Sequence, residues 1–287
     1  MKRQTDYLYG TSSVIMALLS KKRPIQKLFL KESFIHSADQ TLATNLAKNM
    51  DIPIQIASTS QLDKLSGSRP NNGLVLQTGK FNLDYCSDLG LCKRNENSGK
   101  MAFNLIYNGK KERQIETIHN CPLVMFLDKI EDPQNLGTII RTSHFFAIDA
   151  IVMTESNSSP ITASVSKSSA GSLETGNPPI LLAKSMSKII SSAKKNGWNV
   201  FGTNLKGDNV VLIEPFSPPL NLLNAPTILL LGNEGKGIRS SLSNLCDKNL
   251  IISSARNDKN QQYSVESLNV SLAAGILLNH IIQSQSN

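Results

Sequence analysis

The chain has 287 residues, of which 40% are hydrophobic and 18% are charged, with 17 glycines and 12 prolines. This composition is ordinary for a globular protein and excludes collagen-like and wholly disordered chains. No apolar run approaches the roughly 20 residues that a membrane-spanning helix needs, so we expect no membrane association.

The chain is basic, with 30 Lys and Arg against 22 Asp and Glu, a formal net charge of +8. Such an excess modestly favours a polyanionic partner such as a nucleic acid, although solubility alone also explains it. Aromatic residues are 5%, which argues against an extensive base-stacking platform. Because the four cysteines form no CxxC pair and the four histidines are scattered, we expect no metal site and no disulfide framework.

Residues 1–80 predict a small α/β domain. We expect Ser12 or Ser13 to cap its first helix, and Lys21, Lys22, Arg23 and Lys27 to form either a solvated charge cluster or an RNA-facing patch. The remaining predicted elements are strands at 27–30, 52–56 and 73–77 and helices at 38–49 and 61–65.

Residues 81–120 are polar, rich in lysine and without sustained periodicity. They predict a linker with an insertion between two domains.

Residues 121–287 predict a second, larger domain in which apolar strands alternate with helices. This pattern is typical of a mainly parallel sheet covered on both faces, with ligands bound at the carboxyl ends of the strands. The predicted strands are 123–127, 150–153, 180–183, 199–202, 227–231 and 250–252, and the helices are 137–147, 162–171, 186–196, 238–246 and 267–283.

The first polar loop of this domain runs from Asp128 to Gly137. Pro133 and Gly137 predict a turn in which Asn135 hydrogen-bonds its own backbone, with Arg141 early in the next helix. From these residues alone, a purely structural turn with a surface arginine is as plausible as a catalytic or binding loop.

The second loop, from Leu231 to Arg239, follows a buried strand and opens a helix, and its glycines let a ligand approach the backbone closely. It is neither a Walker loop nor a GxGxxG fingerprint, since its glycines stand at 232, 235 and 237. The third loop, 267–271, opens an apolar helix, and Ser267 or Asn269 in isolation predicts only an N-cap.

Together these segments resemble the three signature motifs of the SpoU (TrmH-type) RNA ribose 2′-O-methyltransferases, in the same order. They read DPQNLGTIIR (132–141), LLLGNEGKGIR (229–239) and ESLNVSLAAGI (266–276), and the stretch KSSAGSLE (167–174) is similar as well. The resemblance covers roughly residues 121–283. Three matched motifs in order are far more specific than any one of them.

The first domain, from YGTSSVIMALLS to GLVLQTG, resembles the ribosomal-protein-like RNA-binding domain that precedes the catalytic domain in the ribosomal RNA branch of this family. The most similar branch methylates a guanosine of large-subunit ribosomal RNA and includes mitochondrial members. A mitochondrial location is therefore expected, with a bacterial cytoplasm or a plastid as the alternative.

The resemblance implies a fold that topology rules would not suggest, since knots are nearly absent from proteins. Its members have a parallel-sheet SPOUT domain with a trefoil knot at the carboxyl end and form homodimers through the knot. It also implies S-adenosylmethionine as methyl donor, no metal, and large-subunit ribosomal RNA or its precursor particle as the partner.

By motif match, Arg141 is the residue placed at the ribose hydroxyl and Asn135 supports it, while Glu234 and Asn269 match the other polar site residues. A guanidinium normally stays protonated, so we expect Arg141 to orient the hydroxyl and to stabilise developing charge rather than to act as a simple base. The cofactor is expected against the backbone of Leu231, Gly232, Ile252 and Leu268.

Three other functions compete with this one. A transfer-RNA 2′-O-methyltransferase of the same family is the first, and a non-catalytic RNA-binding factor in ribosome assembly is the second. The third, a nucleotide hydrolase, lacks both a phosphate loop and metal-binding carboxylates.

Overall fold

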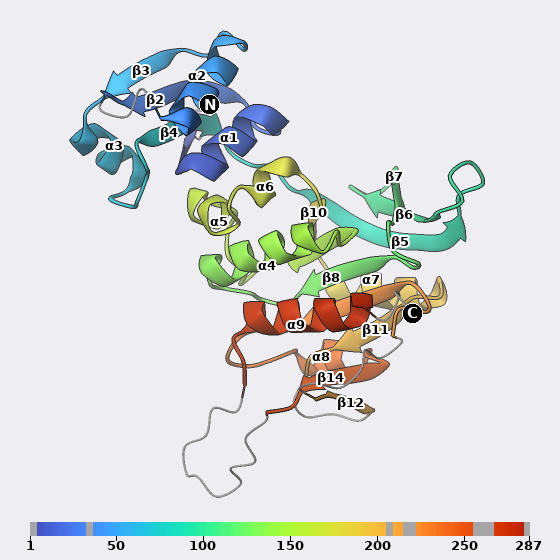
Figure 1. Ribbon diagram of the computed structural model, residues 1–287. Helices are drawn as coiled ribbons and strands as arrows, with labels where there is room; N and C mark the ends of the chain where they lie inside the picture. The colour runs from blue at the N-terminus through green and yellow to red at the C-terminus, as the bar shows by residue number, and fades with distance from the viewer. Residues whose placement is uncertain (1–4, 33–36, 205–208, 215–221, 255–266, 284–287) are drawn as a thin grey trace, which may run out of the picture. The chain divides into compact units, whose positions relative to one another are not determined.

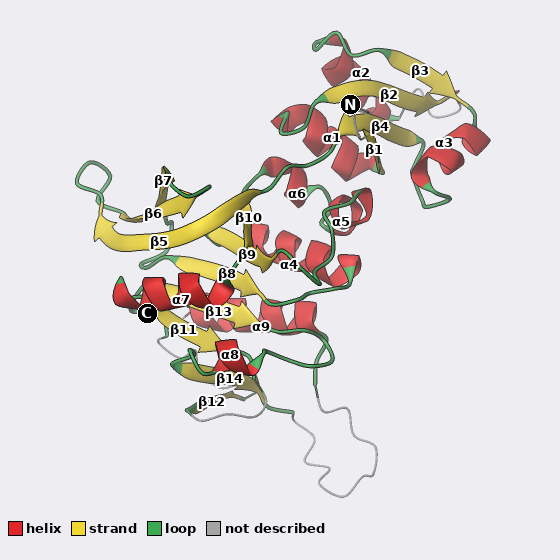
Figure 2. Ribbon diagram, turned by 180° about the vertical axis from the view of Figure 1, so that it is seen from behind, coloured by secondary structure: helices red, strands yellow, loops and turns green. Residues whose placement is uncertain are grey.

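The computed structural model describes residues 5–32, 37–204, 209–214, 222–254 and 267–283. They fall into two compact units (Figures 1 and 2). The first unit comprises residues 1–82, 136–141 and 160–177, and the second comprises the rest of the chain.

The first unit contains a mixed four-stranded sheet within its described residues, in the order β1-β4-β2-β3. Strands β1 and β2 both pair antiparallel with β4, and β2 pairs parallel with β3. Its main elements are β1 (Thr5–Tyr9), α1 (Thr11–Ser20), β2 (Ile25–Lys31), α2 (Ala38–Lys48), β3 (Ile54–Ala57), α3 (Thr59–Ser66) and β4 (Leu74–Gly79). The predicted strands and helices of this region are confirmed, and β1 is an addition to them.

Alternation along the central strands builds a core on each face of this sheet. Leu74 and Leu76 of β4 pack with α1 and α2, whereas Val75 between them packs with Leu62 of α3. Because successive side chains of a strand point to opposite faces, the apolar run of β4 is buried on both sides.

The predicted start of α1 was wrong. The N-cap residue is Gly10, with φ of 85°, and no side chain caps the helix. Ser12 and Ser13 lie inside the first turn, and Ser13 is buried. A left-handed glycine turn, rather than a serine cap, sets the boundary here.

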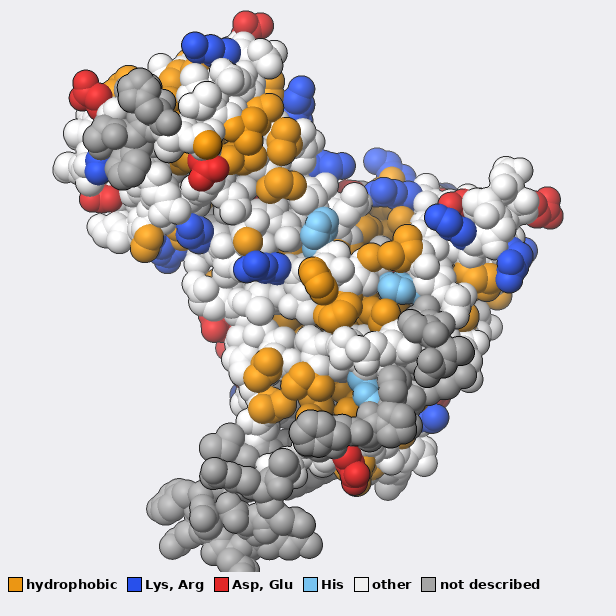
Figure 3. All heavy atoms as spheres, in the orientation of Figure 1, with side chains coloured by type: hydrophobic (Ala, Val, Ile, Leu, Met, Phe, Trp, Pro, Cys, Tyr) orange, Lys and Arg blue, Asp and Glu red, His pale blue; other side chains and the backbone are white. Residues whose placement is uncertain are grey.

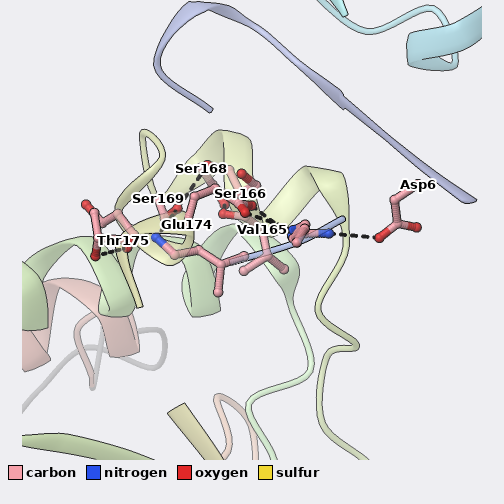
Figure 4. A network of polar contacts seen from close by, with 10 residues as sticks. Asp6, Val165, Ser166, Ser168, Ser169, Glu174 and Thr175 are labelled. Atoms are coloured by element: carbon pink, nitrogen blue, oxygen red, sulfur yellow. Dashed lines mark hydrogen bonds and ion pairs between the residues drawn. The ribbon is translucent and has the colours of Figure 1, made fainter. Parts of the chain in front are cut away.

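Arg23 links two parts of this unit through buried charge. Its Nε and Nη2 atoms each donate to a carboxylate oxygen of Glu174 at 2.8 Å, and Nη1 donates to Asp6 at 3.0 Å (Figure 4). Glu174 lies on α6 (Ser172–Thr175), which follows α5 (Ala163–Ser168). Arg23 is therefore not part of an RNA-facing patch; Lys21 and Lys22 beside it are exposed.

The second unit is built on a sheet that has ten strands in the described residues, in the order β12-β14-β11-β13-β8-β9-β10-β5-β6-β7. All neighbours from β12 to β5 are parallel, which confirms the predicted mainly parallel sheet. The parallel strands are β8 (Leu123–Leu127), β9 (Ala150–Thr154), β10 (Ile180–Ala183), β11 (Asn199–Gly202), β12 (Val210–Ile213), β13 (Thr227–Leu231) and β14 (Lys248–Ile252).

Helices cover both faces of this sheet (Figures 1 and 2). Helices α7 (Met186–Lys195) and α8 (Ser240–Ser243) pack on the face that carries Val124 and Phe126 of β8. Helix α4 (Pro133–Phe145) covers the opposite face, where Ser143 contacts Met125, and α9 (Val270–Gln283) packs against β14. The fold class is therefore confirmed apart from the trefoil knot, which stays a prediction because strand order alone does not define how a chain threads.

The segment expected to be a linker and insertion carries three strands, β5 (Asp84–Arg94), β6 (Met101–Tyr107) and β7 (Lys111–Glu116). Strand β5 pairs parallel with β10, and the hairpins that follow extend the sheet antiparallel. Phe103 of β6 stacks edge-on against Trp198, whose Nε1 donates to the carbonyl of Gly90. This segment therefore shares the core of the second unit.

None of the helices in the described part of the chain is long and apolar enough to cross a membrane.

Candidate active site

The loops that resemble the family motifs leave one edge of the parallel sheet. Leu127 of β8 and Leu231 of β13 are register partners, so Asp128 and Gly232 emerge next to each other. The Asp128 N–H donates to the Leu231 carbonyl at 2.8 Å and closes this edge. Carboxyl ends of parallel strands are the usual place for a ligand in such sheets.

Asn135 stands in a helix, not in the predicted turn. Helix α4 begins at Pro133, with Asp132 as N-cap accepting from the Gln134 N–H. Gly137 is also helical, and a Cβ there would lie 1.8 Å from Ser168 Oγ, so this glycine permits close packing. Proline at the first helical position and an aspartate cap explain this start better than a turn does.

The structure brings together polar residues from all three motifs. Asn269 Nδ2 donates to Asn135 Oδ1 at 3.0 Å, and Asn135 Nδ2 donates to Glu234 Oε1 at 3.0 Å. Asn135 is buried, whereas Glu234 and Asn269 are exposed. We call this chain of hydrogen bonds the motif triad, consisting of Asn135, Glu234 and Asn269.

Asn269 also caps α9, because its Oδ1 accepts from the Ser271 and Leu272 N–H groups. Asn269 is therefore both the predicted N-cap and part of the motif triad. Its side-chain oxygen caps the helix, and its side-chain nitrogen donates to Asn135.

The second loop is held in shape by its own backbone and by Asn233. A Cβ at residue 232 would lie 2.3 Å from the carbonyl carbon of Gly237, so only glycine permits this approach. Asn233 Oδ1 accepts from the N–H groups of Gly235 and Lys236, and its Nδ2 donates to the carbonyl of Lys129 at 2.9 Å.

An ion pair that sequence reasoning missed ties the first loop to the second. Arg239 Nη2 lies 2.7 Å from Asp128 Oδ1, and Arg239 Nε donates to Asp128 Oδ2 at 2.9 Å. The Asp128 side chain is 1% exposed, and Arg239 supplies the opposite charge that a buried carboxylate requires. The only sequence signal was an acidic residue directly after a buried strand.

Arg141 is not joined to the motif triad. It lies on α4 six residues after Asn135, which places it about 9 Å along the helix and rotated by about 120°. Arg141 is exposed and forms no ion pair with any described residue. The arginine is therefore free to contact a bound molecule.

The four residues expected at the cofactor lie at strand and helix ends. Leu231 ends β13, Ile252 ends β14, and β11 ends between these strands at Gly202. Leu268 directly precedes the N-cap of α9 and is 44% exposed, so its side chain is accessible to a bound molecule. These positions offer backbone polar groups and apolar side chains without a reactive group.

Two family models match the chain. One, described as the SpoU rRNA Methylase family, matches residues 122–279, and the other, described as RNA 2′-O ribose methyltransferase substrate binding, matches residues 7–83.

Among similar proteins, the Schizosaccharomyces pombe "rRNA methyltransferase 1, mitochondrial" is 32% identical over 98% of this chain and 91% of its own length. The human protein of the same name is 26% identical over 96% of this chain and 72% of its own. The crystal structure of the SpoU methyltransferase AviRb from Streptomyces viridochromogenes, in complex with AdoMet, shares the fold, with a TM-score of 0.66 and 18% identity over 98% of this chain and 91% of that one. The chain belongs to the SpoU rRNA methylase family.

Proposed function

We propose that this protein transfers a methyl group from S-adenosylmethionine to the ribose 2′-hydroxyl of a guanosine in large-subunit ribosomal RNA. The observation that carries the proposal is the motif triad, in which three motif segments far apart in the sequence meet through 3.0 Å hydrogen bonds at the carboxyl edge of the parallel strands, the usual place for a ligand in such sheets. The names of relatives as ribosomal RNA methyltransferases support the substrate class. The choice of guanosine rests on the resemblance of the motifs and of the first domain.

The residues at the sheet edge fit S-adenosylmethionine chemically. The backbone of Leu231 and Gly232 would hold it by hydrogen bonds, and the side chains of Ile252 and Leu268 would contact its adenine ring. The partly exposed Leu268 gives an apolar surface that a planar base would cover. When bound, the cofactor supplies an electrophilic methyl group on a sulfonium.

Arg141 is the residue that would meet the ribose. A 2′-hydroxyl is a poor nucleophile, so transfer depends on orientation and on stabilisation of the oxygen as it loses its proton. The guanidinium remains charged and offers five N–H donors, which suits it to hold the hydroxyl and the adjacent phosphate. Its exposure and lack of an ion pair with described residues leave those donors available.

The motif triad acts by positioning. It joins the first turn of α4 to the second loop and to the start of α9, so it would hold the start of the helix that carries Arg141. Displacement of a reacting group by about 1 Å lowers the rate by about 10²-fold, so hydrogen bonds that fix the start of this helix would contribute to the rate of methyl transfer.

The proposal extends to the assembly and location of the protein. The first domain, residues 1–80, would bind the RNA, and residues 121–287 would carry the transfer on a sheet that β5, β6 and β7 of the segment 81–120 extend. We propose a homodimer, because Phe145 on α4 and Leu272 on α9 are 81% and 54% exposed. Relatives named mitochondrial favour a mitochondrial location.

The test is transfer of labelled methyl from S-adenosylmethionine to large-subunit ribosomal RNA, followed by mapping of 2′-O-methylated positions. We expect one modified guanosine with the wild-type protein and a loss of at least 100-fold in kcat for Arg141→Ala, with cofactor affinity unchanged. Arg141→Lys keeps the charge but loses the planar fork, so we expect partial activity.

Other results would redirect the proposal. Transfer to transfer RNA alone would move the protein to the other substrate class, which the name of a Bacillus subtilis relative, a TrmH family tRNA/rRNA methyltransferase, includes. Cofactor binding without transfer to any RNA or precursor particle would favour an assembly factor.

A further inference from the structure

The second unit contains a pocket of about 520 Å³ that is not lined by any residue of the motif triad. The start of β5, the turn between β6 and β7, and the start of α7 form its walls. We call it the lysine pocket; the lining residues used below are Tyr85, Ser87, Asn108, Lys184, Ser185 and Lys188. Half of these lie between the segments 7–83 and 122–279 that the family models match.

Two lysines give the pocket its charge. Lys184 lies in the bend just before Ser185, the N-cap of α7, and Lys188 lies in the first turn of that helix; both line the pocket and both are exposed. Neither forms an ion pair with a described carboxylate. Lys184 Nζ lies 4.9 Å from the centre of the Tyr85 ring, which holds the ammonium at the pocket wall.

The carboxylates near the pocket are engaged by neutral donors. The Tyr85 hydroxyl donates to Glu155, Asn108 Nδ2 donates to Asp84 at 2.6 Å, and Ser192 Oγ donates to Asp88 at 2.9 Å. The bond to Glu155 raises the pKa of Tyr85, so the phenol adds no negative charge. These carboxylates keep their charge, but none of them is among the residues that line the pocket, so the two ammonium groups are the charges that face an anion placed in it.

The sheet register relates this pocket to the candidate active site. Leu231, Leu127, Met153, Leu182 and Tyr85 are successive register partners across β13, β8, β9, β10 and β5, so they form one row. Strands lie about 4.8 Å apart, which places Tyr85 about 19 Å from Leu231 along this row.

Lys184 emerges at the same edge as the motif loops. It follows Leu182 by two residues, just as Asn233 follows Leu231 by two residues, and three strand spacings separate them, about 14 Å. A nucleic-acid strand in a double helix carries a phosphate for every 3.4 Å or so of helix axis. An RNA held at the motif loops therefore has other phosphates within reach of the lysine pocket.

We propose that the lysine pocket binds a backbone phosphate of the substrate RNA, a few nucleotides from the ribose that is methylated. This inference rests on the proposed function for the identity of the RNA as substrate. Lysine ammonium groups bind phosphate as point charges, and Ser87, Asn108 and Ser185 add neutral hydrogen-bonding groups at the wall. Such a contact sets the register of the RNA without reading its sequence.

The experiment measures RNA affinity and methyl transfer of the full chain at 50 and 200 mM salt. The variants are Lys184→Gln, Lys188→Gln and the double variant, and Lys195→Gln at the other end of α7 is the matched control. Neutralising one phosphate accounts for about a 2.6-fold (single strand) to 3.5-fold (duplex) dependence on this change of salt, so we expect the dependence of the double variant to be smaller by about that factor. Lys188→Arg keeps the charge and should retain the wild-type dependence.

Kinetics separate this inference from the proposed function. We expect a raised KM for RNA with unchanged kcat and unchanged cofactor affinity. Wild-type methyl transfer with no change of RNA affinity or salt dependence in the double variant would overturn the pocket and leave the function standing. Reduced RNA affinity in a protein that methylates no RNA would support the pocket and refute the function.

Discussion

At the scale of single residues, the amide of Asn135 is the centre of the candidate site. Its nitrogen donates to Glu234 and its oxygen accepts from Asn269, and the side chain is buried. An amide is the group that can donate on one side and accept on the other, so its direction matters as much as its presence.

Replacing the donating nitrogen of this amide with an accepting oxygen tests its role. Asn135→Asp places a carboxylate against the Glu234 carboxylate, so we expect the free energy of unfolding to fall by about 1–3 kcal/mol and kcat to fall more than tenfold. Glu234→Gln keeps an acceptor for Asn135 and should retain most activity. The double variant Asn135→Asp with Glu234→Gln restores a donor opposite the new carboxylate and should recover much of the loss, as measured by kcat and thermal melting. An additive double variant would contradict the direction of bonding.

Asp149 is a buried carboxyl that directly precedes β9, and its Oδ2 accepts from the N–H of Leu123, the first residue of β8, at 2.7 Å. Burial raises its pKa from 3.8 to about 7, against the lowering effect of the hydrogen bonds from Leu123 and Thr117. Between these two pKa values the folded chain holds a proton that the unfolded chain has released. The stabilising contribution is therefore present at lower pH and is lost as the pH rises through 7.

This shift predicts a pH dependence of stability. From pH 6 to pH 8 the free energy of unfolding should fall by about 1 kcal/mol more in the wild type than in Asp149→Asn, which cannot ionise. Urea unfolding followed by the fluorescence of Trp198 measures it, since this is the single tryptophan and it is buried in the same unit. Equal pH dependence in the two proteins would mean that Asp149 is already ionised at pH 6.

At the scale of elements, periodicity predicted the buried strands well and the half-exposed ones poorly. The parallel strands from β8 to β13 are continuous apolar runs, which no other element type of that length explains better. Strand β5 was not predicted, because two register shifts interrupt the alternation of its apolar and polar side chains. They lie between Cys86 and Asp88 and between Leu89 and Cys92.

The motif residues themselves were found in the sequence, but their contacts were not. Asn135 was placed in a turn because proline and glycine near it are typical of turns, while the helix start was decided by Asp132 and by packing at Gly137. The burial of Arg23 was equally hidden, since its partner Glu174 stands 151 residues away. Pairings over such separations leave no local pattern.

The pair of Arg23 and Glu174 should hold α6 to the sheet of the first unit. Both side chains are almost fully buried, so removing one partner leaves an uncompensated charge, at a cost of about 3–5 kcal/mol. For Glu174→Ala we expect faster amide hydrogen exchange in α1 and α6, with unchanged exchange in β8 and β9, measured by mass spectrometry. Glu112→Ala, which removes an exposed carboxylate on β7, is the control. Unchanged exchange in α1 would show that the pair contributes little.

At the scale of the whole molecule, α4 and α9 carry exposed apolar side chains, a feature typical of a surface that binds another protein. Thr142 of α4 and Gly275 of α9 lie side by side, and hydrophobic side chains gather over these helices (Figure 3). Phe145, which follows on α4, is 81% exposed, far more than a large aromatic usually is in a monomer. A second copy of the chain with the same face would cover it, as a two-fold symmetric dimer requires.

Replacing Phe145 therefore tests the dimer. We expect the wild-type protein to have about twice the chain mass of 31.3 kDa by light scattering, and Phe145→Asp to shift toward the monomer at the same concentration. Because the side chain is exposed in the single chain, the variant should keep its fold, with unchanged circular dichroism. Leu91→Asp, at a 56% exposed position on β5, should remain dimeric. A monomeric wild type, or a Phe145→Asp variant that stays dimeric, would place the contact between copies elsewhere. If the dimer is needed for methyl transfer, activity of the variant should rise with protein concentration as the weakened dimer reforms.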